Sequence, residues 1–224
     1  IVLTKEPFCL SKLLMEVDSV IEMQANESGV DYIKAPLNIE NDHLIGSSLH
    51  IKQILQNIVS NAVKYNKRGG YVRVSCTENR IDEKNIMFEF VCTDNGQGMS
   101  EDFQKKAFEP FAQEKTRART TYAGTGLGLA ISKKLTVQMG GTIEFISRQG
   151  YGTTFYVKIP FEIDDSYESR QQEIAADEKI RLDGNKIIIA EDNELNMEIA
   201  RFIIEGAGAQ VMPAVNGEEA VKIF

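Results

Sequence analysis

Gly124-Thr-Gly-Leu-Gly-Leu-Ala130 and Asp94-Asn-Gly-Gln-Gly-Met99 are two glycine-rich stretches that begin 30 residues apart in the chain. Glycines at alternate positions leave backbone N–H groups open to a close ligand, because no Cβ stands between them. The apolar pattern from Leu127 to Leu135 predicts a helix directly after the second stretch, and the unpaired N–H groups at a helix start favour phosphate. Two such turns, the first led by an acidic residue, indicate a nucleotide that is held at both ends.

The second glycine stretch departs from the two common phosphate-binding motifs. Leu129 stands where Gly-x-Gly-x-x-Gly needs its last glycine, and no Gly-Lys-Ser/Thr ends the stretch as it does in a P-loop. The sequence therefore predicts another arrangement for the nucleotide.

Length, composition and charge set the class of protein. A chain of 224 residues suffices for one sizeable domain and a smaller unit, and 42% hydrophobic with 26% charged residues is typical of a soluble globular protein. No apolar run approaches the roughly 20 residues that span a bilayer, so we expect no direct membrane contact. A net charge of −8 argues against binding to nucleic acid.

The three cysteines are widely spaced and odd in number, which favours neither a disulfide framework nor a zinc site. Cys76 and Cys92 fall within apolar strand patterns and are predicted to be small buried side chains. Unpaired thiols are typical of a reducing compartment, so we expect a cytoplasmic location.

Apolar residues at helical spacing indicate two helices in the first part of the chain. One starts near Leu10 and ends before Gly29, and the other spans 47–65, with Ser47 or Ser48 as its cap. The extended segment at 30–39 contains a proline, which favours the edge of a sheet.

Four apolar stretches have the pattern of strands, and together with the helices they indicate the fold class. The sequence predicts strands at 71–76, 86–93, 142–147 and 153–159. Mixed helices and strands with mostly antiparallel neighbours indicate an α+β domain over 7–161, after a short tail at 1–6. We expect a two-layer α/β sandwich, in which helices cover one face of a mixed sheet.

The composition changes after Pro160. Residues 162–185 are rich in acidic side chains and poor in large apolar groups, which is typical of a linker. Lys186-Ile-Ile-Ile-Ala190 then predicts a short strand, and apolar residues from Leu195 to Ile203 recur at helical spacing. We expect residues 186–224 to form a second, incomplete unit.

Three polar residues, Asn57, Asn61 and Lys64, share one stripe of the helix predicted at 47–65. They lie within roughly 60° of one another on the helix, whereas apolar residues cover the opposite side. Such a stripe is usually a solvated face. Amide oxygens nevertheless suit Mg²⁺, which takes its charge partners from phosphate, and Lys64 adds a point charge. We therefore hypothesise a Mg²⁺ and phosphate site on this stripe.

Asp94 ends a predicted strand and starts the first glycine stretch. Taken alone, Asp94-Asn-Gly96 is an ordinary turn motif. In a nucleotide site its carboxylate would accept a hydrogen bond from the exocyclic amine of adenine, while Gly96 and Gly98 would let the base approach the backbone. Guanine carries a carbonyl at the corresponding place, so the site would prefer ATP over GTP.

Five short motifs follow one another in the first 161 residues. They are Gln53-x-x-x-Asn57-x-x-x-Asn61-Ala-x-Lys64-Tyr65, Asp94-x-Gly96-x-Gly98, Phe108-Glu-Pro-Phe111, Gly124-x-Gly126-x-Gly128 and Gly150-x-Gly152-Thr153. In this order they resemble the N, G1, F and G2 boxes and the final glycine box of the ATP-binding catalytic domain of sensor histidine kinases. That domain belongs to a superfamily that also includes gyrase, a heat-shock chaperone and mismatch-repair ATPases.

The resemblance implies roles for the matching residues. Asn61, with Asn57 beside it, would ligate Mg²⁺, Lys64 would touch the terminal phosphates, and Tyr65 would contact the nucleotide. Asp94 would recognise adenine with the help of Thr153. Gly96 and Gly98 would complete the adenine end of the site. The second glycine stretch would contact the nucleotide through Gly124, Thr125, Gly126, Leu127, Gly128 and Leu129.

The resemblance also implies a mobile lid over the phosphates at residues 112–123. Lys115, Arg117 and Arg119 would give this lid a positive charge. Phe108 and Phe111 are interpreted as side chains that anchor the lid by packing.

Asn57 departs from the hydrolysing members of the superfamily, which carry a glutamate there as general base. Asn cannot take up a proton at neutral pH, so the site should keep the terminal phosphate for another nucleophile. This favours a kinase, with Asn57 and Lys64 in catalytic roles, over an ATPase. His43 and His50 lack the His-Glu/Asp context of the family's acceptor, so we expect the acceptor histidine on a separate dimerisation domain.

Residues 186–224 resemble the first third of a response-regulator receiver domain, which has a flavodoxin-like fold. A strand, an acidic pair, a helix and a strand precede Asn216-Gly-Glu-Glu-Ala220, which opens a further helix. In whole receivers the acidic residues after the first strand help to bind Mg²⁺. Asp192 fits that role best, with Glu191 beside it. The phosphorylated aspartate and the later lysine are absent, so this fragment should not accept phosphate.

The sequence thus predicts the ATP-binding catalytic domain of a hybrid sensor histidine kinase, with ATP and Mg²⁺ as cofactors. Its expected partners are ATP, the histidine-containing dimerisation helices and the receiver domain of the parent protein. The alternative is a non-catalytic module that senses ATP or docks partners. Intact boxes favour the kinase.

Overall fold

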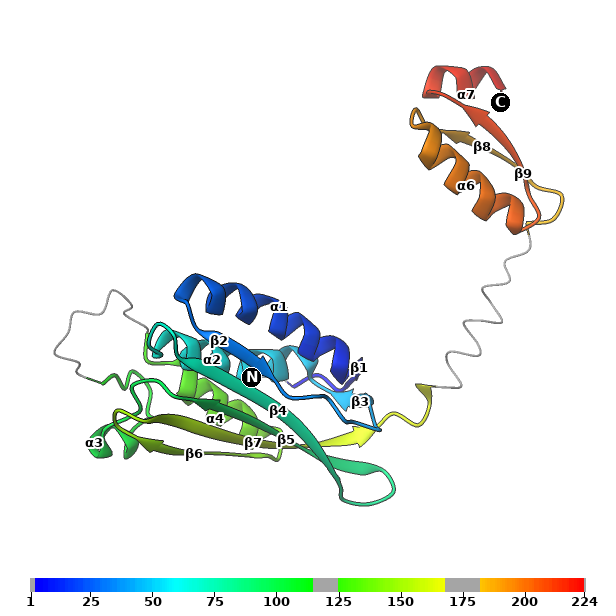
Figure 1. Cartoon of the computed structure of the whole chain (residues 1–224). Helices are drawn as coiled ribbons and strands as arrows, with labels where there is room; N and C mark the ends of the chain where they lie inside the picture. The colour runs from blue at the N-terminus through cyan, green and yellow to red at the C-terminus, as the bar shows by residue number, and fades with distance from the viewer. Residues whose placement is uncertain (1–2, 115–124, 168–181, 224) are drawn as a thin grey trace. The chain divides into compact units, whose positions relative to one another are not determined.

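The computed structural model describes residues 3–114, 125–167 and 182–223 (Figure 1). The chain divides into two compact units, Ile1–Asp165 and Ser166–Phe224. Within the described ranges, no helix combines the length and the apolar content that crossing a bilayer requires.

The N-terminal unit is built on a seven-stranded sheet with the order β1-β3-β7-β5-β4-β2, and β6 pairs with β7 beside this path. The β2–β4 pair is parallel and the other pairs are antiparallel, which confirms the predicted mixed sheet. β2 lies at an edge, as the nearby Pro36 indicated. The strands are β1 (Glu6–Cys9), β2 (Asp31–Lys34), β3 (His43–Gly46), β4 (Tyr71–Arg80), β5 (Asn85–Asp94), β6 (Thr142–Arg148) and β7 (Gly152–Ile163).

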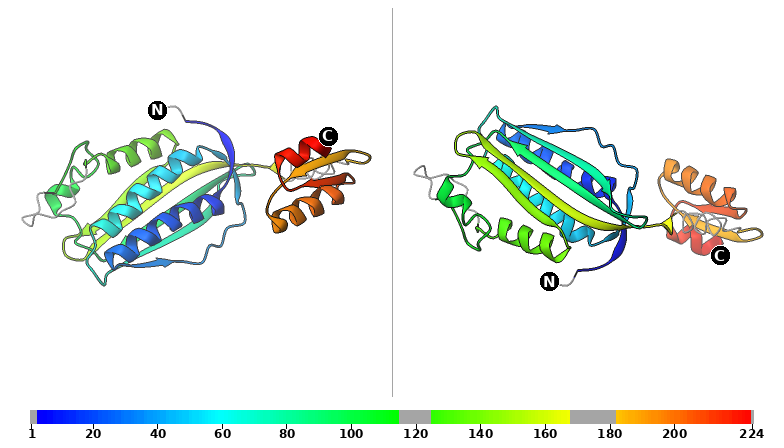
Figure 2. Two further views of the ribbon diagram at one scale, coloured as in Figure 1. Left: turned by 90° about the horizontal axis from the view of Figure 1, so that it is seen from above. Right: turned by 90° about the horizontal axis from the view of Figure 1, so that it is seen from below.

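Three helices, α1 (Leu10–Ser28), α2 (Ser48–Lys64) and α4 (Gly128–Gln138), cover one face of this sheet. Figure 2 shows them side by side on that face, with α2 in the middle. A fourth, short helix is α3 (Glu101–Gln104). The predicted two-layer α/β sandwich is therefore confirmed for this unit.

The core lies between the helices and the sheet. Alternate residues of β5 point into it, and Phe88 at its centre is fully buried. Helix α1 buries one face from Leu10 to Ala25, whereas Val20 is 37% exposed. Cys92 is buried and Cys76 is half-buried, and all three cysteines are free thiols.

Helix α1 takes its N-terminal cap from another part of the chain. Asp42 Oδ1 accepts the Ser11 backbone N–H at 2.7 Å, and Asp42 Oδ2 accepts the Ser11 hydroxyl at 2.6 Å. The Cys9 thiol also donates to Asp42, at 3.1 Å. The helix ends at Gly29, whose φ of 66° is the left-handed conformation predicted for a glycine at that place.

The structure corrects the N-terminal boundary. Residues 1–6 were predicted to be a tail, but Glu6 opens β1, which pairs antiparallel with β3. Each strand has only four residues, which is too short for alternation to be recognisable in the sequence.

Two further boundaries also differ. The predicted loop at 77–85 is shorter, because β4 continues to Arg80 and β5 begins at Asn85; polar residues here stay in the ladder through backbone hydrogen bonds. The predicted linker at 162–185 begins later, because β7 continues to Ile163 and pairs with β3. Residues 168–181 of that segment lie outside the described residues.

The C-terminal unit is a small β-α-β-α arrangement. It consists of β8 (Lys186–Ala190), α6 (Glu194–Gly206), β9 (Gln210–Ala214) and α7 (Gly217–Ile223), and the two strands are parallel. Asn193 caps α6, because its side chain accepts the Leu195 and Asn196 backbone N–H groups. The predicted strand and helix are thus present, and Phe202 on α6 is 83% exposed.

We predict that Asp42→Ala destabilises the N-terminal unit by about 1–2 kcal/mol, because the start of α1 loses its cap. Burial favours a higher pKa for Asp42, but hydrogen bonds from Ser11 and Cys9 outweigh burial and lower that pKa. The stabilisation should therefore be present at neutral pH and be lost as the pH falls through the lowered pKa. Urea unfolding followed by circular dichroism measures both effects. Asp42→Asn keeps one oxygen acceptor and should lose less; an unchanged urea midpoint for Asp42→Ala would contradict the capping role.

Candidate functional site

The polar stripe of α2 faces the start of α4. Asn57 Nδ2 donates to the Gly128 carbonyl oxygen at 3.3 Å and approaches the Ser132 hydroxyl at 3.4 Å. Ser132 is fully buried. Asn57 therefore ties the N-box helix to the helix that follows the second glycine stretch. Sequence reasoning missed Ser132, since no motif marks it.

Asn61 and Lys64 lie further along the same stripe and are half-buried. In the described parts of the chain, the Asn61 side chain has no hydrogen-bond partner, and Lys64 forms no ion pair. Lys64 Nζ lies 5.0 Å from the centroid of the Tyr65 ring, a cation–π contact. Tyr65 follows α2 directly and is 42% exposed. Asn61 and Lys64 can therefore bind a ligand without breaking a hydrogen bond or an ion pair of the described residues.

Asp94 is the last residue of β5 and pairs with Val72 of β4 and Thr153 of β7. Its Oδ1 accepts the Gly96 backbone N–H at 2.8 Å. Burial raises the pKa of Asp94, and the N–H groups of Gly96 and Thr153 offset part of that rise. A half-buried carboxylate of this kind gains from one more hydrogen-bond donor.

Thr153 is buried beside Asp94, but its hydroxyl is already engaged by Ser147 Oγ at 2.9 Å. Ser147 Oγ also accepts the Met99 backbone N–H, at 2.9 Å. Ser147 thus joins the first glycine stretch to β6 and β7. The sequence did not reveal this role, because a serine in a half-exposed strand carries no recognisable pattern.

The glycines of the first stretch have a packing role that the sequence did not reveal. Other protein atoms fill the space of the missing Cβ atoms of Gly96 and Gly98, while the predicted approach of a base to their backbone stays a prediction. A Cβ on Gly98 would lie 2.1 Å from the Arg148 carbonyl oxygen, and one on Gly96 would lie 2.6 Å from the Tyr65 carbonyl oxygen. In the final glycine motif, a Cβ on Gly152 would lie 2.0 Å from the Asp94 carbonyl oxygen. These glycines permit segments of backbone to interlock around Asp94.

Two asparagines that the motifs did not single out strengthen this interlock. Asn66 Nδ2 donates to the Tyr71 carbonyl oxygen at 2.9 Å, and Asn95 Oδ1 accepts the Tyr71 N–H at 2.7 Å. Asn66 thus holds the end of α2, and Asn95 the end of β5, against the start of β4. Their neighbours Tyr65 and Asp94 are thereby kept at the same end of the sheet.

The second glycine stretch is described from Thr125 onward, and Gly124 lies outside the described residues. Leu127 is the N-cap residue of α4, and Leu129 packs against the core. Gly126 has a φ of 70°, and its carbonyl oxygen accepts the Phe111 N–H at 2.9 Å. A predicted helix from Leu127 to Leu135 is confirmed as α4, which continues to Gln138.

The two phenylalanines of the F box differ in their surroundings. Phe108 lies against Phe145 with ring centroids 5.5 Å apart, and Lys133 Nζ lies 4.8 Å from the Phe108 ring centroid. Phe111 is 72% exposed with a φ of 64°, and its backbone N–H contacts Gly126. Its role as an anchor of the lid stays a prediction, because residues 115–123 lie outside the described residues. Lys115, Arg117 and Arg119 lie outside the described residues.

The acidic pair of the C-terminal unit follows β8. Glu191 accepts the Asn193 backbone N–H at 3.0 Å, which lowers the pKa of Glu191, while Asp192 is exposed. The described residues contain no cluster of three His, Cys, Asp or Glu side chains that could hold a metal. A Mg²⁺ role for Asp192 and Glu191 stays a prediction.

Comparison with known proteins assigns the N-terminal unit to a family. The family described as Histidine kinase-, DNA gyrase B-, and HSP90-like ATPase matches residues 46–163, just over half of the chain. The chain belongs to this family. The matched residues run from the end of β3 to the end of β7 and include Asn57, Asp94 and Gly128.

Relatives resemble the chain well beyond that match. The aerobic respiration control sensor protein ArcB of Escherichia coli strain K12 is 31% identical, over 99% of this chain and 28% of ArcB. Sensor histidine kinase AruS of Pseudomonas aeruginosa is 32% identical, over 96% of this chain and 21% of AruS. Histidine protein kinase 1 of Candida albicans is 36% identical over 68% of this chain and 6% of that protein. The chain thus spans less than a third of each relative.

Solved structures show the same fold. Full-length ShkA in complex with AMPPNP has a TM-score of 0.57 and 27% identity, over 99% of this chain and 43% of ShkA. The catalytic domain of histidine kinase ThkA has a TM-score of 0.54 and 27% identity, over 70% of this chain and 95% of that domain. The N-terminal unit is therefore a histidine-kinase ATPase catalytic domain.

We predict that Gly98→Ala destabilises this domain much more than Gly150→Ala. Both glycines have positive φ, 61° and 83°, but nothing lies within 4 Å of a Cβ on Gly150. Gly150→Ala should cost about 1–2 kcal/mol of left-handed strain, and Gly98→Ala should cost at least about 2 kcal/mol more through its clash with Arg148. Equal urea midpoints for the two variants would contradict the proposed backbone interlock.

Proposed function

We propose that the chain is the ATP-binding catalytic part of a hybrid sensor histidine kinase. In this proposal it binds Mg-ATP and presents the terminal phosphate to a histidine on a separate dimerisation domain. The observation that carries the proposal is the stripe of Asn57, Asn61 and Lys64 beside the start of α4, with half-buried Asp94 at the end of β5. Membership of the histidine-kinase ATPase family supports it.

The adenine end of the site would be formed by Asp94 and Tyr65. Asp94 is held by its strand neighbours and by the Gly96 N–H, so its carboxylate is oriented before a ligand arrives. The exocyclic amine of adenine is a donor that fits this acceptor. Tyr65 offers an exposed ring face within the same end of the unit.

The phosphate end would be formed by the stripe on α2 and by the start of α4. The Asn61 amide oxygen, with that of Asn57, would hold Mg²⁺, which when bound neutralises phosphate charge. These neutral oxygens fit that ion, because phosphate supplies the remaining ligands. Lys64 would hold a terminal phosphate, and backbone N–H groups from Thr125 to Leu129 would face the same charges.

The chemistry of Asn57 favours transfer over hydrolysis. Its amide takes up no proton at neutral pH, and its Nδ2 is engaged by the Gly128 carbonyl, so it cannot serve as general base toward water. The histidines of this chain serve other contacts: His50 Nδ1 hydrogen-bonds Ser47 Oγ at 2.6 Å, and His43 opens β3. The acceptor would therefore be a histidine elsewhere.

The C-terminal unit would be the first part of a receiver domain. Its parallel β8 and β9, connected through α6, and the acidic Glu191 and Asp192 after β8 support this proposal. The alignments with ArcB and ShkA cover 99% of the chain and thus include this unit. We propose domain limits of 6–165 for the catalytic domain and 186–224 for the receiver part, with a linker between them.

We predict that Asp94→Asn weakens Mg-ATP binding about 10- to 100-fold, because a charge-assisted hydrogen bond to adenine is lost. Isothermal titration calorimetry measures the affinity, and Asp192→Asn in the other unit is the matched control. Because the pKa of Asp94 is raised, affinity in the unchanged chain should fall as the pH drops through that pKa, and Asp94→Asn should lose this dependence. Equal affinity for Asp94→Asn and the unchanged chain would contradict the adenine contact.

The direct test of the kinase proposal is phosphate transfer. We expect ATP labelled in its terminal phosphate to leave no stable label on this chain alone, and to give acid-labile label on added dimerisation helices of the parent protein. Asn61→Ala should abolish the Mg²⁺-dependent transfer, whereas Asn79→Ala on β4 should not. Nucleotide binding without transfer would support the ATP-sensing alternative, and rapid release of free phosphate would support a hydrolase. Label on His43 or His50 would overturn the assignment of the acceptor to another domain.

A further inference from the structure

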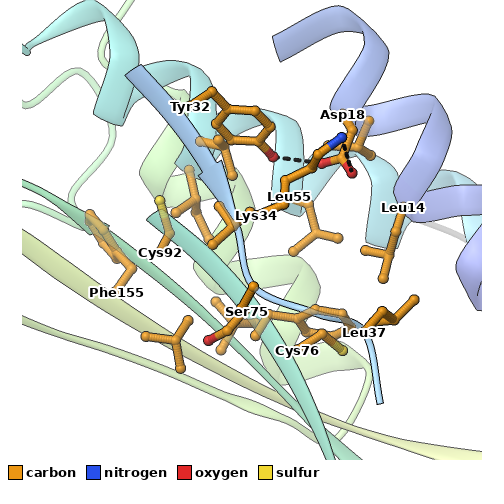
Figure 3. A pocket seen from close by; sticks show the side chains of 18 of the residues that line it. Leu14, Asp18, Tyr32, Lys34, Leu37, Leu55, Ser75, Cys76, Cys92 and Phe155 are labelled. Carbon is orange, nitrogen blue, oxygen red and sulfur yellow. Dashed lines mark hydrogen bonds and ion pairs between the residues drawn. The ribbon is translucent and has the colours of Figure 1, made fainter. Parts of the chain in front are cut away.

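A cavity of about 320 Å³ lies within the N-terminal unit, between α1, β2, α2 and the helix-facing side of the sheet (Figure 3). Apolar side chains from α1, α2, β4, β5 and β7 form most of its wall. They include Leu14, Val17, Leu55, Ile58, Val74 and Phe90. The cavity is therefore an apolar chamber bounded by regular secondary structure.

This cavity is separate from the candidate nucleotide site. Helix α2 contributes Leu55, Ile58 and Val59 to its wall, whereas Asn57 and Asn61 are not among the lining residues. From β5 the cavity is lined by Cys92 but not by Asp94. The two sites thus lie on different sides of the same helix.

The charged groups of the cavity gather where β2 meets α1. Tyr32 donates its hydroxyl hydrogen to Asp18 Oδ1 at 2.6 Å, and Lys34 Nζ lies 3.9 Å from Asp18 Oδ2 (Figure 3). Lys34 also pairs with Glu22. Two carboxylates against one ammonium leave this end with a net charge of −1, which disfavours an anionic ligand.

The remaining polar groups of the wall are neutral. Burial raises the pKa of the Cys76 thiol to about 12, and it also raises the pKa values of Cys92 and Tyr32. The thiols and the phenol therefore stay protonated at neutral pH. Few polar groups face the cavity, so water alone finds few hydrogen bonds there.

The rim gives access from solvent. Met15 and Leu37 line the cavity and are 69% and 41% exposed, and the Lys34 side chain is 46% exposed. Flexible side chains such as these can move aside without disturbing the sheet. An apolar molecule can therefore enter between α1 and the segment that follows β2.

We propose that this cavity binds a small uncharged apolar molecule that enters beside Met15 and Leu37. A 150 Å³ apolar cavity accepts benzene, so a cavity of about 320 Å³ suits a body of roughly eight to twelve carbon atoms. The apolar wall selects such a body, and the net negative end rejects its carboxylate analogue. The proposal rests on the cavity alone and holds whether or not the chain transfers phosphate.

The test uses 1-octanol and octanoate, which share a chain and differ in charge. In the full chain, 1-octanol should bind saturably by calorimetry and shift methyl NMR signals of Leu14, Leu55 and Ile58 but not that of exposed Ile146. Octanoate should bind at least about tenfold more weakly, because Asp18, Glu22 and Lys34 together leave one uncompensated negative charge that repels its carboxylate. AMPPNP should not displace 1-octanol. Displacement by AMPPNP, equal binding of octanoate or the absence of saturable binding would each overturn the proposal.

A pair of substitutions on β4 gives a matched control. Cys76→Phe places a ring in the cavity and should remove the binding of 1-octanol, whereas Thr77→Phe adds the same ring on the opposite face of the sheet. Thr77→Phe should leave the affinity within about twofold of the original chain. Retained binding in a folded Cys76→Phe chain would overturn the proposal, and the methyl shifts in the unsubstituted chain decide the question if that variant does not fold.

Discussion

Burial of one side of α2 against the sheet is the constraint on which the rest of the N-terminal unit depends. The helix lies between α1 and α4, so its apolar residues must fill the centre of the core. The side that remains is polar and half-buried, and it holds Asn57, Asn61 and Lys64 beside the first residue of α4. One helix thereby separates an apolar chamber on its α1 side from a polar site on its α4 side.

Backbone packing at the end of the sheet is the second requirement. Gly96, Gly98 and Gly152 each leave space that a carbonyl oxygen of another segment occupies. Asp94 consequently lies beside closely packed backbone, with the Gly96 and Thr153 N–H groups directed at its carboxylate. Its environment raises its pKa through burial while the Gly96 N–H holds one oxygen in place. A carboxylate fixed in this way is suited to recognise a donor on a flat ring.

Much of the fold was predictable because long elements carry strong periodicity. Helices α1, α2 and α4 and the central strands agree with the sequence prediction to within a few residues. The predictions failed at β1 and β3, which have four residues each, and at the polar outer part of the β4–β5 hairpin. In these places pairing with a neighbour creates the strand, and the hydrophobic pattern is too short or too polar to reveal it.

The amino-acid sequence was enough to predict the family, the order of the boxes and the residues that line one stripe of α2. These depend on residue types at fixed spacings along the chain. Four features became visible only in the folded chain. The glycines allow backbone segments to pack closely, Asn57 contacts Gly128, Phe111 is exposed, and a cavity lies between α1 and the sheet. Each of these features depends on contacts between segments that are distant in the sequence. Those contacts form only when all the helices and strands pack together.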